Sequence, residues 1–426
     1  MRILILVDCY YPSRKSSAKL VHDLAVELNR RGNQVVVVTP SDAITENLEL
    51  QVEGGVSVLR VSSGQIKGAK RIQRALREVR LSATVWHQAE KFFQENPCDL
   101  ILFYSPTIFW GPLVLRLKQL WSCPSYLILR DIFPDWAADA GILQPGLIYQ
   151  FFRKVALAQY RCADVIAVQS PANLEHFARS YPQDNFRLEV LFNWADLTRP
   201  DRPRLNHRAR LGLQGKTVFL YGGNIGVAQD MDNILRLAVR LAPRPDIHFL
   251  LVGAGSEVSR IQKNIASRRL RNIQILSDLS QEEYLSMVSE FDFGLISLDA
   301  RLKTHNIPGK LLSYLYWGLP VLASANAGND LFTLLAESGA GFCVLNGEDE
   351  RLARVALRLA DDRGAVPAMR KNARRLLEQK FSVENAVNQI FKHLHAAQLF
   401  VPADTAASRR SSTASQVHSP ELAAKY

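Results

Sequence analysis

Residues 304–323 read Thr-His-Asn-Ile-Pro-Gly-Lys-Leu-Leu-Ser-Tyr-Leu-Tyr-Trp-Gly-Leu-Pro-Val-Leu-Ala, and this stretch decides how the rest of the chain is interpreted. Pro308 and Gly309 interrupt the backbone, after which leucine and tyrosine recur at helical spacing as far as Gly318. The proline that follows forbids continuation of the helix, and the last three residues are typical of a buried strand. The stretch therefore predicts a loop, a short helix beginning near Lys310, a glycine stop and a strand.

The start of this helix is a candidate anion site. A helix N-terminus exposes unpaired N–H groups and carries a partial positive charge, and Lys310 adds a full charge at that place. The alternative is a surface connection between a helix and a strand, whose lysine faces water. Spacing alone leaves both interpretations open.

Length and composition indicate a globular protein of two domains. At 426 residues the chain is too long for one ordinary hydrophobic core. Its hydrophobic content is 47%, and no apolar run is long and charge-free enough to cross a bilayer. The apolar N-terminus ends at Asp8, and no small-residue cleavage site follows. We therefore interpret it as a first strand and not as a signal peptide.

The cysteines and the net charge indicate where the protein is located and what kind of partner it binds. The five cysteines are scattered and show no C-x-x-C spacing, which favours reduced thiols, a cytoplasmic location and no zinc or other metal site. The net charge of +11 indicates an anionic partner, which could be a nucleotide, a nucleic acid or an acidic membrane.

Strands and helices are predicted to alternate along the chain. A strand over 3–7, an amphipathic helix over 18–31 that Gly32 stops, and a strand over 35–38 form a βαβ unit. Such a unit predicts a parallel sheet with right-handed crossovers and an α/β fold. Further strands are predicted over 56–61, 100–103, 126–129, 165–168, 189–191, 217–221, 248–252, 273–276 and 293–296.

A polar interval rich in proline and arginine divides the alternation. We predict a first domain over 1–195, a linker over 196–215 and a second domain over 216–380. Two domains of this kind bind ligand at the carboxyl ends of their strands, here in the cleft between them. A final helix within 381–399 precedes residues 401–426, whose polar composition predicts disorder.

Residues 66–81 predict a basic amphipathic helix. Lys67, Lys70, Arg71 and Arg74 share one face at helical spacing, and apolar residues share another. This pattern suits an anionic membrane surface, and the alternative is a solvated helix packed on its own domain. Nucleic acid is not expected as a partner, because no aromatic residues interleave the basic ones.

Small residues follow several predicted strands. Residues 222–226, Gly-Gly-Asn-Ile-Gly, would let backbone N–H groups approach a pyrophosphate. Residues 253–255, Gly-Ala-Gly, lack the third glycine of a dinucleotide fingerprint, which argues against a dehydrogenase. Arg130 and Asp131 follow another strand, where they could hold a sugar hydroxyl or a phosphate. An ordinary surface ion pair is the alternative.

An ordered series of motifs carries a family resemblance over nearly the whole chain, from the first strand to about residue 396. The series is Asp8-Cys9-Tyr10-Tyr11-Pro12, Arg130-Asp131-Ile132-Phe133-Pro134-Asp135, Phe192-Asn193-Trp194-Ala195-Asp196, Tyr221-Gly222-Gly223-Asn224-Ile225-Gly226, Asn306-Ile307-Pro308-Gly309-Lys310, Gly318-Leu319-Pro320-Val321 and Glu337-Ser338-Gly339-Ala340-Gly341. A chain with this series resembles a GT-B glycosyltransferase of the GT4 family, and most resembles its WbuB-like branch of bacterial aminosugar transferases in O-antigen and capsule assembly.

The resemblance implies a fold and a reaction. The fold would be two Rossmann-like parallel-sheet domains facing across a cleft, with the last helix crossing back to the first domain. The reaction would be retaining transfer of a sugar from a UDP-sugar, without a required metal. The expected acceptor is a polyprenyl-diphosphate-linked saccharide, which the basic helix would meet at the inner face of the plasma membrane.

Two departures from the family pattern concern the donor site. The family carries two glutamates where this chain has His305 and Ser313, and a glycine pair where it has Ser16 and Ser17. The second glutamate normally grips the ribose, and a serine offers only a neutral hydrogen bond there. Serine hydroxyls can still donate to a phosphate, although the backbone has less freedom than at glycine.

We therefore expect the donor pyrophosphate to lie across the glycine-rich loop and the helix start at Lys310, which would neutralise the leaving UDP. Arg130 and Asp131 would approach from the first domain to position sugar or acceptor. The expected donor-binding residues are Ser16, Ser17, Gly222, Gly223, Asn224, Gly226, His305, Asn306, Ile307, Pro308, Gly309 and Ser313.

We predict front-face substitution, because no recognisable motif supplies the carboxylate pair of a double displacement. In this scheme the leaving phosphate itself helps to accept the acceptor proton. A general-base role for His305 is the alternative.

Two other classes of function stay open. One is a UDP-aminosugar epimerase on the same architecture, which would act without an acceptor. The other is a non-catalytic sugar-nucleotide-binding scaffold protein of a polysaccharide assembly complex, which would bind UDP without turnover.

Overall fold

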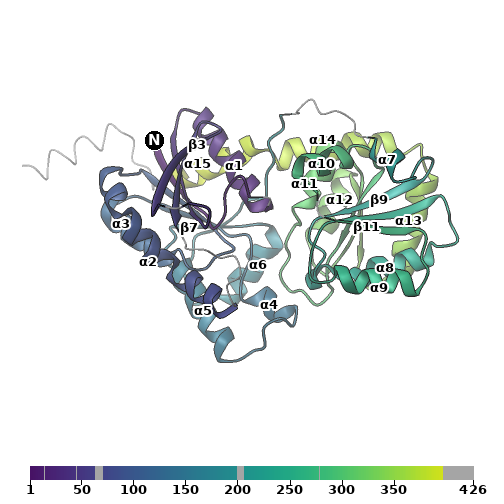
Figure 1. Ribbon diagram of the computed structural model, residues 1–426, viewed down its shortest axis with the longest axis horizontal. Coiled ribbons are helices and arrows are strands. Elements are labelled where there is room, and N and C mark those ends of the chain that lie inside the picture. The colour runs from purple at the N-terminus through teal and green to yellow at the C-terminus, as the bar shows by residue number, and fades with distance from the viewer. Residues whose placement is uncertain (14, 45, 63–70, 199–205, 278, 397–426) are drawn as a thin grey trace, which may run out of the picture.

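The chain folds into two Rossmann-like α/β domains, each built on a predominantly parallel sheet (Figure 1). The computed structural model describes residues 1–396 apart from 14, 45, 63–70, 199–205 and 278. The predicted fold class is confirmed. The predicted tail over 401–426 lies outside the described residues.

The first sheet has eight strands in the order β3-β4-β2-β1-β5-β6-β7-β8. All its pairs are parallel except the edge pair of β3 and β4. The strands are β1 Arg2–Leu6, β2 Gln34–Ser41, β3 Leu48–Glu53, β4 Val56–Ser62, β5 Leu100–Tyr104, β6 Ser125–Ile128, β7 Val165–Val168 and β8 Leu188–Val190.

Helices cover both faces of this sheet, which explains why its central strands are apolar throughout. Side chains alternate along β1, so that Ile3 and Ile5 pack on the face under α1, whereas Leu4 and Leu6 pack on the other. The helices are α1 Ser16–Arg30, α2 Arg71–Glu95, α3 Gly111–Trp121, α4 Asp135–Asp139, α5 Leu147–Tyr160 and α6 Pro171–Ser180.

The second sheet has six parallel strands in the order β11-β10-β9-β12-β13-β14. Helices α8, α9 and α13 cover one face, and α10, α11, α12 and α14 cover the other (Figure 1). The strands are β9 Thr217–Gly222, β10 Ile247–Val252, β11 Ile273–Leu276, β12 Phe293–Ser297, β13 Val321–Ala325 and β14 Gly341–Leu345. The helices are α7 His207–Arg210, the 3₁₀ helix η1 Val227–Gln229, α8 Met231–Arg240, α9 Val258–Ser267, α10 Gln281–Val288, α11 Lys310–Trp317, α12 Leu331–Ser338, α13 Asp349–Asp361 and α14 Val366–Lys380.

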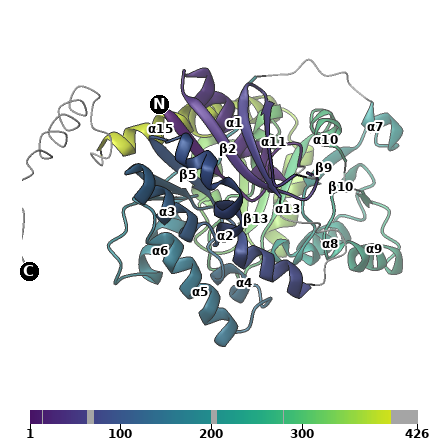
Figure 2. The same ribbon diagram turned by 60° about the vertical axis from the view of Figure 1, so that its left-hand side comes forward.

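The chain passes between the two sheets twice. The bridge between Ala195 and Ser382 joins the outgoing and returning segments, and the last helix, α15 Val383–Ala396, packs against α1 (Figure 2). The interval 196–215, predicted as a linker, contains α7. Arg208 in this helix binds Asp292, so α7 is packed on the second domain.

Two strands were missed by the sequence analysis, and both lie at sheet edges. Strand β3 forms a hairpin with β4 through the two-residue turn Gly54-Gly55, in which both glycines have positive φ. That dipeptide is a hairpin signal that could have found the strand. Strand β14 follows the glycine stop at Gly339.

The glycine-rich loops after β9 and β10 pack directly on each other. A Cβ atom on Gly253, whose φ is +152°, would lie 1.9 Å from the carbonyl oxygen of Gly223. The Ile225 amide donates to the Ala254 carbonyl at 2.9 Å. The small residues at 253–255 therefore allow close approach of two loops, which accounts for them without a dinucleotide.

We predict that Gly253→Ala lowers the free energy of unfolding by about 2–5 kcal/mol, because it adds both backbone strain and a clash with a backbone atom. The control is Gly215→Ala, where φ is +71° and nothing lies within 4 Å of the added Cβ. That change should cost only about 1–2 kcal/mol. Denaturant unfolding of both variants measures the difference, and equal losses would contradict the packing argument.

Candidate functional site

A cavity of about 770 Å³ lies between the two domains. It opens where β1, β5 and β6 of the first sheet and β9, β10 and β12 of the second end, which is where α/β sheets bind ligands. Its lining includes most of the predicted site: Ser16, Ser17, Arg130, Asp131, Gly222, Gly223, Asn224, Asn306, Ile307, Pro308, Gly309, Lys310 and Ser313.

Two predicted donor-site residues, Gly226 and His305, do not line this cavity. Gly226 is buried beside Asn224, and its amide donates to the Gln229 side chain at 3.2 Å. The His305 ring lies beside Asn326, 3.3 Å from its amide nitrogen. Burial lowers the pKa of His305, and the electrostatic effect of His176 on α6 lowers it further.

Lys310 lines the cavity and brings a positive charge to its second-domain wall. Its ammonium lies 3.5 Å from the centre of the Tyr221 ring, a cation–π contact with the strand end of β9. No carboxylate within the described part of the chain forms an ion pair with it. Burial lowers the pKa of Lys310 well below its ordinary value. The site therefore holds a cation with no balancing negative charge, which an anionic ligand would supply.

The first turn of α11 leaves amides available beside this ammonium. The helix begins at Lys310, and its first recorded backbone bonds are donated by Leu311 and Leu312. Among the described residues, no acceptor is recorded for the amides of Gly309 and Lys310. Their N–H groups and the helix dipole favour an anion at this end.

The glycine-rich loop contributes less than predicted. The Gly222 amide donates to the Tyr314 hydroxyl at 3.0 Å, and the Gly223 amide donates to the Val252 carbonyl at 2.8 Å. These two N–H groups are therefore not free for a pyrophosphate, and the prediction that they bind it is corrected. The loop instead shapes the cavity floor close to Lys310.

Ser16 and Ser17 form the first turn of α1 on the opposite wall. Ser17 Oγ lies 3.2 Å from the Cys9 sulfur, and the Ser16 side chain is exposed. The serine pair therefore places two hydroxyls and a second helix start at the cavity from the first domain.

Arg130 is buried, and its guanidinium faces the chain crossing between the domains. It donates to the carbonyls of Leu191 and Phe192 and lies 5.1 Å from the Trp194 ring centre. Burial lowers its pKa. The alternative of a surface ion pair with Asp131 is wrong, because Arg130 binds backbone oxygens beneath the cavity wall.

Asp131 lies against the second domain. Its Oδ1 accepts a hydrogen bond from Asn306 at 3.1 Å. Burial raises the pKa of Asp131 to about 6, and the negative charge of Asp8 raises it as well, while the Asn306 bond and the Arg130 charge oppose this. The carboxylate therefore links the two domains and titrates close to neutral pH.

The start of α6 fastens the loop before α11 to the first domain. Asn173 accepts from the His305 amide at 2.7 Å and donates to Asn306 at 2.8 Å. The neighbouring Gln169 donates to the Ile307 carbonyl at 2.6 Å. We call these contacts the interdomain latch, and they set where the N-terminal end of α11 lies relative to the first domain.

The sequence analysis missed Asn173 and the role of Tyr221. Ser170 caps α6 by accepting from the Asn173 amide at 3.2 Å, and Pro171 occupies the first turn. This start signal directly follows β7, so it could have been read as a helix start at the ligand edge. No local pattern shows that Asn173 meets a segment 132 residues away.

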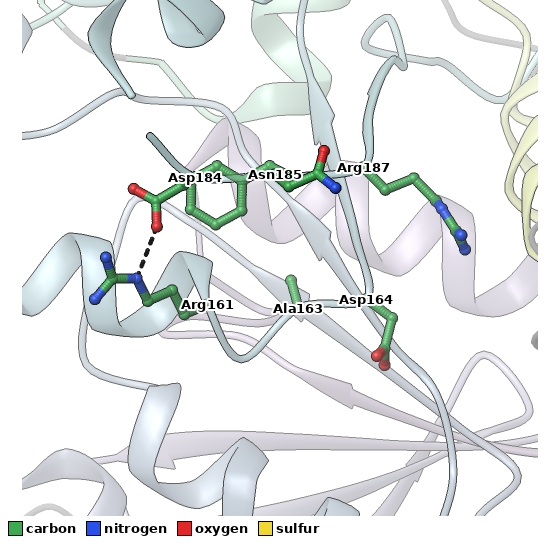
Figure 3. A pocket seen from close by; sticks show the side chains of 7 residues that line it. Arg161, Ala163, Asp164, Asp184, Asn185 and Arg187 are labelled. Carbon is green, nitrogen blue, oxygen red and sulfur yellow. Dashed lines mark hydrogen bonds and ion pairs between the residues drawn. The ribbon is translucent and has the colours of Figure 1, made fainter. Parts of the chain in front are cut away.

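A second hollow of about 470 Å³ lies at the amino-terminal ends of strands β7 and β8, opposite the strand ends that line the cavity (Figure 3). Arg161 donates to Asp184 across it at 2.9 Å. Asp164 accepts from Lys118 at 2.8 Å. These charges are balanced within the protein, and the hollow is remote from the ligand edge, so it is not the candidate site.

The predicted membrane residues are described only in part. Lys67 and Lys70 lie outside the described residues. Arg71 and Arg74 fall in the first two turns of α2, whose side chains there are also outside the description. In the described ranges, every helix is too short or too polar to cross a bilayer.

Two family models match the chain in sequence. Residues 17–194 match the glycosyl transferase 4-like domain, and residues 203–376 match glycosyl transferases group 1. The first covers the α/β domain that carries Asp131, and the second covers the domain that carries Lys310.

Two curated relatives are similar in sequence. The probable glycosyltransferase WbjE of Pseudomonas aeruginosa is 25% identical over 60% of this chain and 64% of its own length. The match thus spans a little under two thirds of that relative. The putative colanic acid biosynthesis glycosyl transferase WcaI of Escherichia coli is 24% identical over 92% of this chain and 100% of its own length.

Solved structures show the same fold at low sequence identity. Sucrose-phosphate synthase from Thermosynechococcus elongatus has a TM-score of 0.73 at 17% identity, over 93% of this chain and 99% of that one. HepE of Anabaena, in complex with UDP and glucose, has a TM-score of 0.66 at 18% identity, over 93% and 100%. The fold is therefore GT-B.

We predict that Asn173→Ala lowers the free energy of unfolding by about 1–3 kcal/mol, because Asn173 is buried and the His305 amide loses its acceptor. The matched control is Asn388→Ala, which removes an exposed contact with Arg31 between α15 and α1. The control should change stability by less than about 0.5 kcal/mol. If denaturant unfolding shows equal losses for the two variants, the latch does not stabilise the protein as we predict.

A second prediction concerns Asp131 and pH. Its pKa is about 6 in the folded protein against 3.8 without burial, so the folded state holds the proton more tightly. This contribution to stability is fully present below pH 3.8 and is lost as the pH rises through about 6. Asp131→Asn removes the titration. Between pH 4 and 7 the wild type should therefore lose about 1–3 kcal/mol relative to the variant. Parallel pH profiles of thermal unfolding would contradict the assignment.

Proposed function

Because the chain belongs to the GT4-family glycosyltransferases, we propose that it transfers a sugar from a UDP-sugar to a saccharide acceptor in polysaccharide biosynthesis. The similarity to WbjE, to WcaI and to the UDP complex of HepE supports this choice of donor and process. In finer detail, the proposal is retaining transfer of a hexosyl unit, an N-acetylated aminosugar, without a required metal.

The observation that carries the proposal is the Lys310 ammonium. It lies in the interdomain cavity, over the Tyr221 ring and at the open end of α11. A diphosphate fits this combination of a full charge and free helix amides better than a neutral ligand does. The same groups would stabilise the negative charge that develops as UDP leaves.

The remaining donor contacts follow from the walls of the cavity. Ser313 lies one turn along α11 from Lys310 and faces the same space, which suits the ribose or the sugar. Ser16 and Ser17 face the cavity from the first domain, where their hydroxyls would complete the diphosphate site on the opposite side.

The proposed chemistry is front-face substitution. The bond between the anomeric carbon and the leaving phosphate oxygen breaks, the acceptor oxygen bonds to the same face, and the acceptor proton passes to the leaving phosphate. Asp131 orients the acceptor or the sugar through its place beside Asn306, and buried Arg130 holds this wall in position. Each group acts through position and field more than through proton transfer.

The proposed acceptor is a saccharide on a polyprenyl diphosphate at the inner face of the plasma membrane, in assembly of O-antigen, capsule or exopolysaccharide. The net charge of +11 favours an anionic surface of this kind. The protein would work in the cytoplasm as a peripheral membrane enzyme.

The direct test is mass spectrometry of products after incubation with a panel of UDP-sugars and polyprenyl-diphosphate-linked acceptors. Transfer that depends on both substrates is the expected result. A changed UDP-sugar in the absence of acceptor would instead indicate an epimerase. Binding of UDP without any product would indicate a scaffold protein.

We predict two opposite effects of Lys310→Met. Affinity for UDP should fall at least about tenfold, since a hydrogen bond with a charged group contributes roughly 1.5–3 kcal/mol. The ligand-free protein should become more stable, because the variant removes a cation whose pKa is lowered by burial. Calorimetric titration with UDP and thermal unfolding without ligand measure the two effects.

The matched control is Lys303→Met, which changes an exposed lysine in the same loop but outside the cavity. It should alter neither UDP affinity nor stability by a measurable amount. Undiminished affinity for UDP in Lys310→Met would remove Lys310 from the donor site.

A further inference from the structure

The turn between α4 and α5, together with the start of α5, exposes a cluster of large apolar side chains. Ile142 is 58% exposed, Leu147 91%, Ile148 64% and Phe151 49%. We call these four residues the apolar tip. The surface of a soluble protein rarely exposes so many large apolar side chains within ten residues of chain. Such clusters mark sites where a membrane, a ligand or another protein binds.

We propose that the apolar tip inserts into the lipid bilayer and docks the first domain on it. This inference rests on the proposed function, in that it gives the enzyme a way to reach a lipid-linked acceptor. It goes beyond that function because it assigns the docking to a segment other than the basic helix α2.

The charges within the segment that carries the tip favour an anionic lipid surface over a protein partner. Residues 141–154 contain no aspartate or glutamate, and their two charged residues are Arg153 and Lys154. The Lys154 side chain is exposed, whereas Arg153 donates to the Ser180 carbonyl at 3.1 Å. Apolar side chains followed by a basic pair match the acyl region of a membrane and its anionic headgroups.

The tip is held in place by bonds to α4. The amides of Ile142 and Leu143 donate to the Ala137 carbonyl at 2.9 and 3.0 Å. The Tyr149 hydroxyl donates to Asp135 at 2.9 Å. Both ribbon views show α5 and the turn before it at the lower extremity of the first domain (Figures 1 and 2). Because these bonds already order the backbone, the apolar side chains point outward from a fixed turn. Insertion would therefore cost little conformational entropy.

An aromatic row joins the tip to the cavity. Phe151 lies 5.4 Å from Phe152, Phe152 lies 5.2 Å from Phe133, and Phe133 lies 6.5 Å from Trp136, measured between ring centres. Trp136 lines the interdomain cavity. A lipid-linked substrate could therefore keep its apolar chain on aromatic surface while its polar head reaches Asp131. This continuity is the reason to place the bilayer, and not a second copy of the chain, on the tip.

The test uses the full chain and vesicles of phosphatidylglycerol and phosphatidylethanolamine. The variant is Leu147→Glu with Ile148→Glu, and both sites are exposed enough that folding should not suffer. Vesicle binding in a flotation assay should fall at least about tenfold, because two inserted side chains become charged. The matched control is Leu50→Glu with Val52→Glu, which alters two apolar residues that are also mostly exposed, 58% and 72%, on edge strand β3.

Loss of flotation in the tip variant alone, with UDP affinity and thermal stability unchanged, supports the proposal. Equal flotation of the wild type and the tip variant overturns it, as does an equal loss in the β3 control. A dimer in analytical ultracentrifugation that the tip variant abolishes, without vesicle binding by the wild type, would place a second copy on the tip and also overturn it. Tip-dependent vesicle binding without sugar transfer would overturn the proposed function and leave the membrane contact standing.

Discussion

The uncompensated charge of Lys310 is the constraint on which the site depends. Its ammonium lies over the Tyr221 ring in a cavity between two domains, and no carboxylate within the described residues balances it. Burial of a cation without a counter-charge costs stability, as its lowered pKa shows. An anionic ligand, such as the proposed diphosphate, would recover that cost.

Two sets of contacts position this charge: the close packing of two loops in the second domain, and hydrogen bonds between the two domains. Close packing at Gly253 holds the loops after β9 and β10 together, and Lys310 at the start of α11 lines the cavity beside them. The latch through Asn173 then fixes the preceding loop from the other side. One short segment therefore faces the proposed diphosphate and also sets the relative position of the domains. Binding of donor and closure of the cleft should be coupled for this reason.

Local patterns in the sequence predicted the fold and the helix that begins at Lys310. Proline, glycine and helical spacing near Lys310 indicated the helix start that the structure has, and alternation of apolar strands with helices predicted both parallel sheets. The failures came from contacts between distant segments. The Gly222 amide is taken by a hydroxyl 92 residues away, so a glycine-rich loop did not mean free N–H groups. Likewise, the side chain of Arg130 turned out to bind the crossing segment, and His305 faces α6 and not the cavity. None of these partners can be read from spacing along the chain.

The most direct measurement is a crystal structure of the protein with UDP bound. The account predicts that the diphosphate lies in the interdomain cavity, with an oxygen about 2.7–2.9 Å from the Lys310 ammonium and within hydrogen-bonding distance of the first amides of α11. UDP bound elsewhere, or bound in the cavity with Lys310 still directed at the Tyr221 ring and away from phosphate, would contradict it.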